Sequence, residues 1–517
     1  MMEKIILFLR AWKVIKLDKN EINFIKFLKK KKIYPKQNKI LIINSLFSYF
    51  NLVFVFLLSI EKKYRSYHFI FYKPHMYFYR YDLKDNILIF IIKYYKSLLL
   101  CYFMNCGFLN FFKFISKKSF NLVNKDIFKE IYLLNIAKKI IANINCKTDL
   151  QKIKFRGILI GDSIYDTYLR FKNVGTVDLK DPFLIEIISK SIFAIIKLDN
   201  MFANRKPNLF LTPDTSYIQH GILLKFFLKK KIPSYTFESR VDYLKKIIWI
   251  NNSFKNFKKY KSIFSKFIDK KSKLNEAKKL LKEKFNGKII DQEKWMPHSA
   301  YKSSTKIHIK NKIKCAIFLH CFVDAPLNKG GIIFDDYNDW IIKTLDFLRE
   351  KKMQKKTIIK PHPNSQCHEF DLYIKKKYPE FIWVDRKVSN YSIFKLKPEF
   401  GLSVLGTILH EMAYYNIYPI ACGHNPNISY KFVTTCKNQK EYFNILNKCS
   451  QKKIKYNANK NEIYEMVYCH YLNEEMKENL IAKKLNLKAL IDEKKSISLI
   501  KFINSFQNLK LNHYDNV

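Results

Sequence analysis

The stretch "KPHPNS" at residues 360–365 places one histidine between two prolines. It follows "KKTII", a short apolar run that is typical of a buried strand. Pro361 and Pro363 fix the backbone on both sides of His362, which lowers the entropy that the loop loses on binding a ligand. A rigid imidazole at a strand end, with Lys360 beside it, suits a phosphate or a nucleotide base. An ordinary turn with an exposed histidine explains the tetrapeptide alone equally well.

Two further loops at predicted strand ends carry polar side chains. "LHCFVDAP" at 319–326 offers His320 and Asp324, and "GLSVLGTILHE" at 401–411 runs straight into a predicted helix. Hydroxyl groups and free backbone N–H groups at a helix N-terminus favour phosphate, and a glycine lets the phosphate approach the backbone. The residues of the second loop that fit this chemistry are Ser403, Gly406 and Thr407, with Glu411 one turn later as an acceptor for ribose hydroxyls. The alternative is a simple helix cap followed by a solvated acid.

Paired carboxylates follow another apolar run, in "GDSIYDTYLR" at 161–170. Asp162 and Asp166 are four residues apart, so they lie on one side of a predicted helix start. A carboxylate is a common general base for a sugar hydroxyl, so both are candidates for catalysis. Arg170 could balance the pair or hold an acidic acceptor. The alternative is a helix cap and a structural ion pair.

Two more candidates lie further along the first half of the chain. In "PDTSYIQHGILLK" at 213–225, His220 is one to two turns into a predicted helix, where it either contacts an acceptor or is partly buried. Glu238, in "YTFESR", stands at another predicted strand end and is a third candidate base.

The elements that must position these residues alternate between strand and helix in both halves of the chain. A chain of 517 residues is too long for one core. We therefore predict an α/β fold of two doubly wound Rossmann-like domains that face a cleft, with a helical C-terminal extension. The predicted parts are a basic lead-in over 1–37, an acceptor domain over 38–290, a nucleotide-donor domain over 305–450 and a helical tail over 451–517.

The order of these motifs resembles a known group of enzymes. A strand-end HP followed about 40 residues later by S-x-x-G-T-x-x-x-E is similar to the second domain of GT-B glycosyltransferases. The narrower resemblance is to bacterial capsule and surface polysaccharide biosynthesis proteins. These include Kdo transferases and sialyltransferases that use CMP-sugars and, more distantly, CDP-glycerol glycerophosphotransferases. The resemblance covers about residues 310–430 well and the first domain only loosely.

The resemblance implies roles for the motif residues. His362 and Pro363 match the HP motif, Ser403 and Thr407 match a hydroxyl-bearing loop that contacts the donor phosphate, and Glu411 matches an acid that contacts the ribose. The hydroxyl groups of that loop are adjacent in the family but separated here, so the identity of the donor stays open.

The activity that the resemblance implies is metal-independent transfer of a sugar from a nucleotide-sugar, preferably CMP-linked, to a glycan or lipid-linked acceptor, without a cofactor. Two alternatives remain. One is a glycerophosphotransferase that uses CDP-glycerol, and the other is a non-catalytic assembly protein at the membrane.

The charge of the chain points to anionic partners. Lys and Arg number 95 against 44 Asp and Glu, which gives a net charge of +51. The bases are nearly all Lys, whereas Arg is the better fork for nucleic-acid phosphates and bases. We therefore expect an anionic donor, an acidic glycan or an anionic membrane surface as partner, and no nucleic acid.

Cysteine spacing and the N-terminal sequence indicate the compartment. Ten cysteines without CxxC pairs predict reduced thiols, with neither a zinc site nor a disulfide framework. The N-terminus has no small-residue cleavage site, so we expect a cytoplasmic chain, at most peripheral on the inner face of the membrane. Residues 40–60 carry no charge, and they predict either a buried strand–helix unit or a membrane span.

Overall fold

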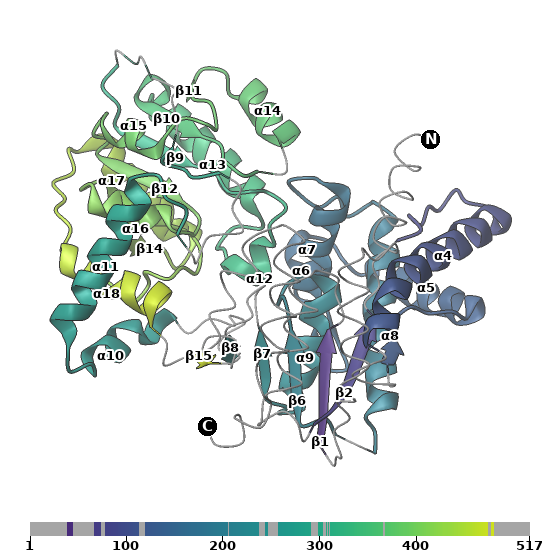
Figure 1. The fold of residues 1–517 in the computed structure, drawn as a ribbon. Coiled ribbons are helices and arrows are strands. Elements are labelled where there is room, and N and C mark those ends of the chain that lie inside the picture. Colours follow the sequence, from purple (N-terminus) through teal and green to yellow (C-terminus); the bar gives the residue numbers. More distant parts are fainter. Residues whose placement is uncertain are drawn as a thin grey trace. The chain divides into compact units, whose positions relative to one another are not determined.

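The computed structural model of the protein divides into two compact units. The structure describes residues 39–44, 67–73, 78–112, 119–204, 206–236, 243–246, 257–290, 298–302, 307, 309, 311–365, 368–473 and 477–479. The first unit comprises Met1–Ile164, Leu179–Ile247 and Glu474–Val517, and the second comprises Tyr165–Asp178 and Ile248–Asn473. Each unit contains its own largely parallel sheet with helices packed on it (Figure 1).

The second unit is built on a six-stranded parallel sheet. Its strands are β9 (Cys315–Phe318), β10 (Thr357–Lys360), β11 (Ile382–Trp383), β12 (Phe400–Ser403), β13 (Tyr418–Ala421) and β14 (Thr434–Thr435). Their spatial order is β11-β10-β9-β12-β13-β14, which is 3-2-1-4-5-6 in chain order. This is a doubly wound order of the nucleotide-binding type. From β9 the chain adds strands toward one edge of the sheet, and from β12 it adds them toward the other edge. The sheet agrees with the Rossmann-like prediction for this half of the chain, whereas the GT-B arrangement of two domains stays a prediction.

Helices cover both faces of this sheet. They are η2 (Phe257–Lys259), α10 (Tyr260–Ser265), α11 (Lys270–Phe285), α12 (Pro326–Gly330), α13 (Tyr337–Glu350), η4 (Gln354–Lys356), α14 (His368–Lys377), α15 (Asn390–Phe394), α16 (Ile408–Tyr414), α17 (Gln439–Gln451), α18 (Lys460–Val467) and η5 (Tyr468–Leu472). Every residue of β9, β10 and β12 is buried, as expected for parallel strands covered on both sides.

The boundary of the second unit differs from the prediction. We expected the first domain to extend to residue 290, but α10 and α11 belong to the second unit. Ala277 and Leu281 of α11 lie in one hydrophobic core with Leu409 and Met412 of α16. The apolar side of this lysine-rich helix therefore determines that it packs in the second unit. Its charged residues did not indicate which unit it belongs to.

The first unit contains a seven-stranded sheet. Its strands are β1 (Lys39–Asn44), β2 (Tyr67–Lys73), β3 (Ser119–Asn121), β6 (Leu209–Thr212), β7 (Ser234–Thr236), β8 (Tyr243–Lys246) and β15 (Lys477–Asn479). The order is β15-β8-β7-β6-β1-β2-β3, and β8 and β15 are antiparallel to their neighbours. The tail over 451–517 was predicted to be helical. α18 and η5 are helical, whereas β15 is a short strand at the edge of this sheet, and residues 480–517 lie outside the described residues. A small hairpin of β4 (Lys154–Phe155) and β5 (Ile158–Leu159) stands apart from the sheet.

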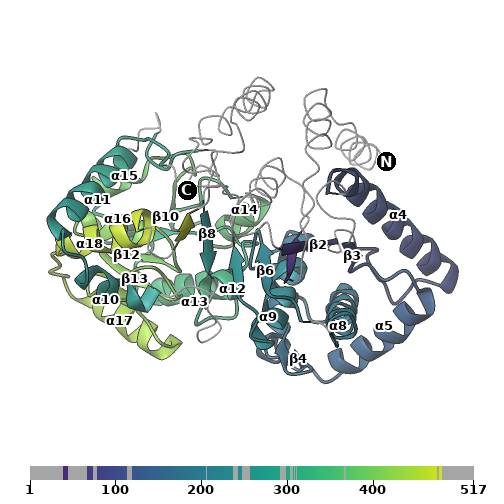
Figure 2. The same cartoon turned by 60° about the horizontal axis from the view of Figure 1, so that its bottom comes forward.

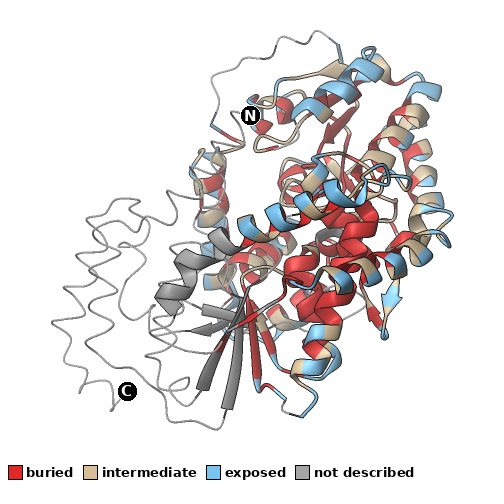
Figure 3. Ribbon diagram, turned by 90° about the vertical axis from the view of Figure 1, so that its right-hand side faces the viewer, coloured by how far each residue is buried: buried red, intermediate tan, exposed pale blue. Residues whose placement is uncertain are grey.

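Helices of the first unit lie beside this sheet (Figure 2). They are α4 (Ile87–Phe112), α5 (Ile127–Ile141), α6 (Lys147–Gln151), α7 (Gly161–Lys172), α8 (Phe183–Met201), η1 (Tyr217–Gly221) and α9 (Ile222–Lys229). α7 begins in this unit and its residues from Tyr165 onward count with the second. Figure 3 shows the buried residues concentrated in strands and central helices, whereas exposed residues line the outer helices.

Residues 40–60 were predicted to form either a strand–helix unit or a membrane span. The start of this stretch is β1, a strand paired with β2 and β6, and residues 45–60 lie outside the described residues. Among the helices that the structure describes, none is both long enough and apolar enough to cross a membrane.

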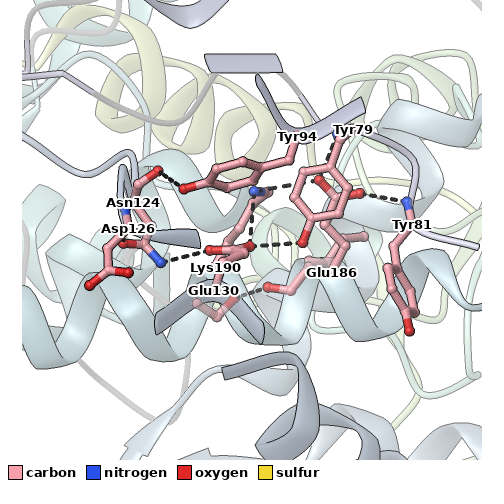
Figure 4. Close-up of polar contacts among 10 residues, drawn as sticks. Tyr79, Tyr81, Tyr94, Asn124, Asp126, Glu130, Glu186 and Lys190 are labelled. Carbon is pink, nitrogen blue, oxygen red and sulfur yellow. Dashed lines mark hydrogen bonds and ion pairs between the residues drawn. The ribbon is translucent and has the colours of Figure 1, made fainter. Parts of the chain in front are cut away.

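A buried ionic cluster ties three parts of the first unit together (Figure 4). Lys190 of α8 lies 3.6 Å from Glu130 of α5 and 3.4 Å from Glu186 on its own helix. Glu186 accepts hydrogen bonds from the backbone N–H groups of Tyr79 and Tyr81, at 2.8 and 3.0 Å. The hydroxyl group of Tyr79 donates to Glu130 at 2.8 Å. Burial raises the pKa of Glu186, although Lys190 opposes this shift, so the pair of carboxylates is held by hydrogen bonds as well as by charge.

Candidate functional site in the second unit

Three loops meet at the carboxyl edge of the second sheet, where β10, β9 and β12 end side by side. The Nε2 atom of His320, two residues after β9, lies 2.6 Å from the carbonyl oxygen of Leu405 after β12. Because a carbonyl only accepts, Nε2 carries the hydrogen and donates. The His320 ring stacks on Tyr337, with centroids 5.2 Å apart, and is near-parallel to His362 at 6.0 Å. The predicted convergence of His320 and His362 is therefore present in the structure.

The β12 loop is shaped by Gly406 and Ser403. Gly406 has a φ of +113°, and a Cβ atom at this position would lie 3.2 Å from Nε2 of His320. Glycine is required here both for the backbone angle and for the close approach of the imidazole. The buried hydroxyl group of Ser403 donates to the carbonyl oxygen of Phe318, at 3.1 Å, and lies 3.4 Å from that of Leu405. Ser403 thus holds the loop to the end of β9.

His362 presents one unambiguous donor. Its Nδ1 atom accepts a hydrogen bond from the backbone N–H of Asn364 at 3.2 Å, so the ring hydrogen belongs on Nε2. Burial, together with the neighbouring His320 and Lys360, lowers the pKa of His362 to about 4, although Asp324 opposes this shift. His362 is therefore neutral at pH 7, with an Nε2–H group as its donor.

Lys360 and Glu411, both predicted to bind the donor, are joined instead in a buried network. Nζ of Lys360 donates to Oδ1 of Asn390 at 2.5 Å, and Nδ2 of Asn390 lies 3.5 Å from Glu411. Glu411 also accepts a hydrogen bond from the hydroxyl group of Tyr301, at 2.6 Å, and forms an ion pair with Lys284 at 2.7 Å. Glu411 is 1% exposed as a whole residue. The expected direct contact of Glu411 with a ribose is replaced by a packing role beneath the loops.

The electrostatics of this network follow from its burial. Burial alone would raise the pKa of Glu411, but the ammonium group of Lys284 and the hydrogen bond from Tyr301 outweigh it and hold the pKa below its usual range. Burial lowers the pKa of Lys360 to about 8, although Glu411 opposes the shift. The network therefore contains a charged Glu–Lys pair and a second lysine that deprotonates more readily than an exposed one.

The remaining predicted donor residues lie around the same edge. Thr407 is the N-cap of α16 without a side-chain cap bond, and this helix has only seven residues. Asp324 is close enough to His362 to oppose the fall in its pKa, and it raises the pKa of Tyr337. Pro363 is half-buried beside His362. Among the residues that the structure describes, no cluster of His, Cys, Asp or Glu is arranged to hold a metal ion.

In the first unit, Asp162 and His220, two of the residues predicted for the acceptor side, are buried. Asp162 forms an ion pair with Lys225, whose Nζ atom also donates to the hydroxyl group of Ser163 at 2.9 Å. Lys225 is 1% exposed. His220 lies in the π-helical turn η1, and burial lowers its pKa to about 4. Glu238, the third candidate base, lies outside the described residues.

Asp166 has a different environment from Asp162, although both lie on α7. Its buried carboxylate accepts hydrogen bonds from the backbone N–H groups of Leu327 and Asn328, at 3.2 and 2.9 Å. The side-chain amide of Asn328 adds a third, at 2.6 Å. Asp166 therefore holds the first turn of α12, whereas Asp162 pairs with Lys225. Arg170, in the last turn of α7, is exposed.

Several residues of these networks were not predicted from the sequence. They are Tyr337, Asn390, Tyr301, Lys284 and Lys225. For Lys225 there was a signal, because a lysine inside "ILLKFFL" needs a buried partner. For the other four residues, the spacing of residues in the sequence does not indicate which strands and helices they contact.

Comparison with known proteins gives little. No family model matches the chain, and no curated protein matches it. Among solved structures it is similar to Thermosulfurimonas dismutans KpsC, a beta Kdo 2,7 transferase, with 12% sequence identity, a TM-score of 0.31 and coverage of 53% of this chain and 79% of that one. A likeness at this level carries no argument about activity, so function must be inferred from the site itself.

Proposed function

We propose that this chain is a glycosyltransferase that moves a sugar from a nucleotide-sugar to a capsule or other surface polysaccharide, or to a lipid-linked precursor. The supporting observation is the position of His320, His362 and Gly406. His320 and Gly406 follow β9 and β12, the two strands between which the order of the sheet reverses, and His362 follows the neighbouring strand β10. Open α/β sheets bind nucleotides at this point.

In the proposed donor site, neutral His362 contacts the phosphate or the base through Nε2–H. Transfer breaks the bond between the anomeric carbon and a phosphate oxygen, which leaves negative charge on the nucleotide. A preorganised donor at that oxygen stabilises the charge without reorganisation. A CMP-sugar, with its single phosphate, is the preferred donor, and the proposal includes neither a metal ion nor a cofactor.

In the proposed acceptor site, residues of the first unit bind the glycan and remove the proton from the attacking hydroxyl. Asp162, His220 and Glu238 of the first unit are the candidate bases, and Arg170, which counts with the second unit, is a candidate for binding an acidic acceptor. His220 is neutral at pH 7, as a base must be to accept a proton. Asp166 serves the reaction only by positioning the first turn of α12, at Leu327 and Asn328.

A nucleotide-release assay tests this proposal. The purified chain is incubated with a CMP-sugar, a UDP-sugar or CDP-glycerol, and free nucleotide is measured with and without a surface glycan. We expect release from the CMP-sugar, near-complete loss in His362→Ala, and wild-type rates in His298→Ala, whose side chain is exposed. Release from CDP-glycerol alone would identify a glycerophosphotransferase. Unchanged glycan production by cells carrying His362→Ala would favour a non-catalytic assembly protein.

A further inference from the structure

One long helix of the first unit, α4, is apolar on two opposite faces. Its inner face consists of Phe90, Tyr94, Ser97 and Cys101, which are all buried. The rings of Phe90 and Tyr94 pack on Tyr79 with centroids 5.6 and 6.0 Å away. α4 is therefore fixed to the unit by this face, and the opposite face is turned away from the core.

The outer face of α4 carries an exposed stripe, formed by Leu88, Ile92, Tyr95 and Leu99. The residues are three or four positions apart, so they line one side of the helix over about 16 Å. Their side chains are 63, 58, 52 and 54% exposed. Scattered single hydrophobic residues are normal on a surface, but a continuous stripe marks a contact with a partner or a membrane. Seven of the thirteen exposed large hydrophobic residues in the described part of the chain lie between Leu83 and Leu99.

The charges around the stripe identify the kind of partner. α4 contains no Asp or Glu. Exposed Lys96 lies on α4 beside the stripe, exposed Lys84 lies in the turn before this helix, and Lys93 is paired with Asp85 at 2.7 Å. Two copies of this helix would bring like charges together, which disfavours self-association. An apolar face flanked by lysines is the pattern of a helix that lies in the interface of an anionic membrane, and an aromatic such as Tyr95 suits that interface.

We propose that the outer stripe of α4 docks this chain onto an anionic lipid surface, with the helix axis in the plane of the interface. Leu88, Ile92 and Leu99 enter the boundary between headgroups and acyl chains. Lys84 and Lys96 face the anionic headgroups. The proposal does not depend on transferase activity, and it applies equally if the chain has another enzymatic role.

Vesicle co-sedimentation of the full chain tests this docking. The vesicles contain phosphatidylglycerol and phosphatidylethanolamine, or phosphatidylcholine alone. We expect binding to the anionic vesicles, at least tenfold weaker binding to the neutral ones, and a tenfold or greater loss for the triple variant Leu88→Ser, Ile92→Ser, Leu99→Ser. Lys84→Glu with Lys96→Glu should lose binding to anionic vesicles several-fold. The matched control is Leu372→Ser with Tyr373→Ser, which removes exposed apolar residues of α14 and should bind as wild type.

A second variant keeps the test decisive if the triple variant unfolds. In Tyr95→Trp, the added fluorescence should be quenched by lipids brominated on their acyl chains, and absence of quenching would overturn the proposal. Wild-type binding by the folded triple variant would also overturn it. So would a wild-type dimer in sedimentation analysis that the triple variant converts to a monomer, because a second copy would then cover the stripe. Nucleotide affinity measured without lipid should be unchanged in the triple variant, which separates this proposal from the proposed function.

Discussion

The Nε2 atom of His320 donates a hydrogen bond to the carbonyl oxygen of Leu405, at 2.6 Å, and so joins the loop after β9 to the loop after β12. These are the two strands between which the order of the second sheet reverses. The side chain of His320 therefore sets the distance between these two loops, and doubly wound sheets bind ligands at this reversal of strand order.

Gly406 allows this arrangement, so Gly406→Ala should disturb it. An alanine would be strained at a φ of +113°, and its Cβ atom would lie 3.2 Å from Nε2 of His320. We expect a loss of about 1–3 kcal/mol in the free energy of unfolding and about a tenfold loss of nucleotide affinity. The control is Gly287→Ala, at a φ of +85°, which should cost stability but not affinity. Calorimetric titration of both variants decides, and wild-type affinity in Gly406→Ala would remove the loop from the site.

The protonation of His362 predicts how nucleotide binding depends on pH. The pKa of His362 is lowered to about 4, so the ring is neutral throughout the range from pH 6 to 8. If its Nε2–H group binds the nucleotide, the contribution of His362 to affinity should be flat over this range. His362→Gln, which keeps an N–H donor, should retain more affinity than His362→Ala. A wild-type affinity that rises as pH falls through 6.5, and that His362→Gln abolishes, would show that a charged imidazolium binds instead.

The buried pair of Lys284 and Glu411 should matter for stability. Both side chains are nearly inaccessible, at 7 and 2% exposure. Lys284→Met leaves Glu411 charged and unpaired, which should cost about 3–5 kcal/mol in urea denaturation. The double variant with Glu411→Leu should recover much of this loss. Lys343→Met, which breaks the exposed pair with Asp339, should change stability by about 0.5 kcal/mol or less. Equal effects of the two single variants would contradict the network.

His410 is a buried imidazole whose ring nitrogens have no hydrogen-bond partner among the described residues. Burial lowers its pKa to about 3, below the value of about 6.5 in an unfolded chain. The unfolded chain therefore takes up a proton first, and the stability present above pH 6.5 is lost as pH falls.

His410→Leu should be neutral or stabilising at pH 7, because it removes an unsatisfied polar group. Between pH 6.5 and 5, the free energy of unfolding should fall by about 2 kcal/mol less in His410→Leu than in the wild type. Denaturation at the two pH values measures this difference. His298→Leu, at an exposed position, should leave the pH dependence unchanged. A wild-type pH dependence in His410→Leu would show that its pKa is not lowered.

Local pattern was enough to predict the strand ends that carry the candidate donor site. Prolines around His362 and the small residues before α16 mark chain reversals, and these follow from backbone sterics alone. Local chemistry also explains the start of α13, where the carboxylate of Asp336 accepts the N–H of Asp339 at 2.7 Å.

Pairings over long sequence distances could not be predicted in this way. Glu411 was predicted to contact a ribose, with a solvated surface acid as the alternative, because its partner Lys284 is more than 100 residues away. Asp166 looked like half of a catalytic pair because its spacing from Asp162 is helical, yet its hydrogen-bond donors are at Leu327 and Asn328. Spacing gives the face of a helix, but not the element that covers that face.

The most direct test of the proposed donor site is whether a nucleotide stabilises the fold through His362. Thermal unfolding of the wild type is measured with CMP and with UDP at increasing concentrations, and repeated with His362→Ala. A ligand present at 100 times its dissociation constant adds about 2.7 kcal/mol to the free energy of unfolding. We expect CMP to raise the melting temperature of the wild type more than UDP does, and to leave that of His362→Ala nearly unchanged. If neither nucleotide stabilises the wild type, or if both stabilise His362→Ala equally well, the second unit does not bind the donor in this way.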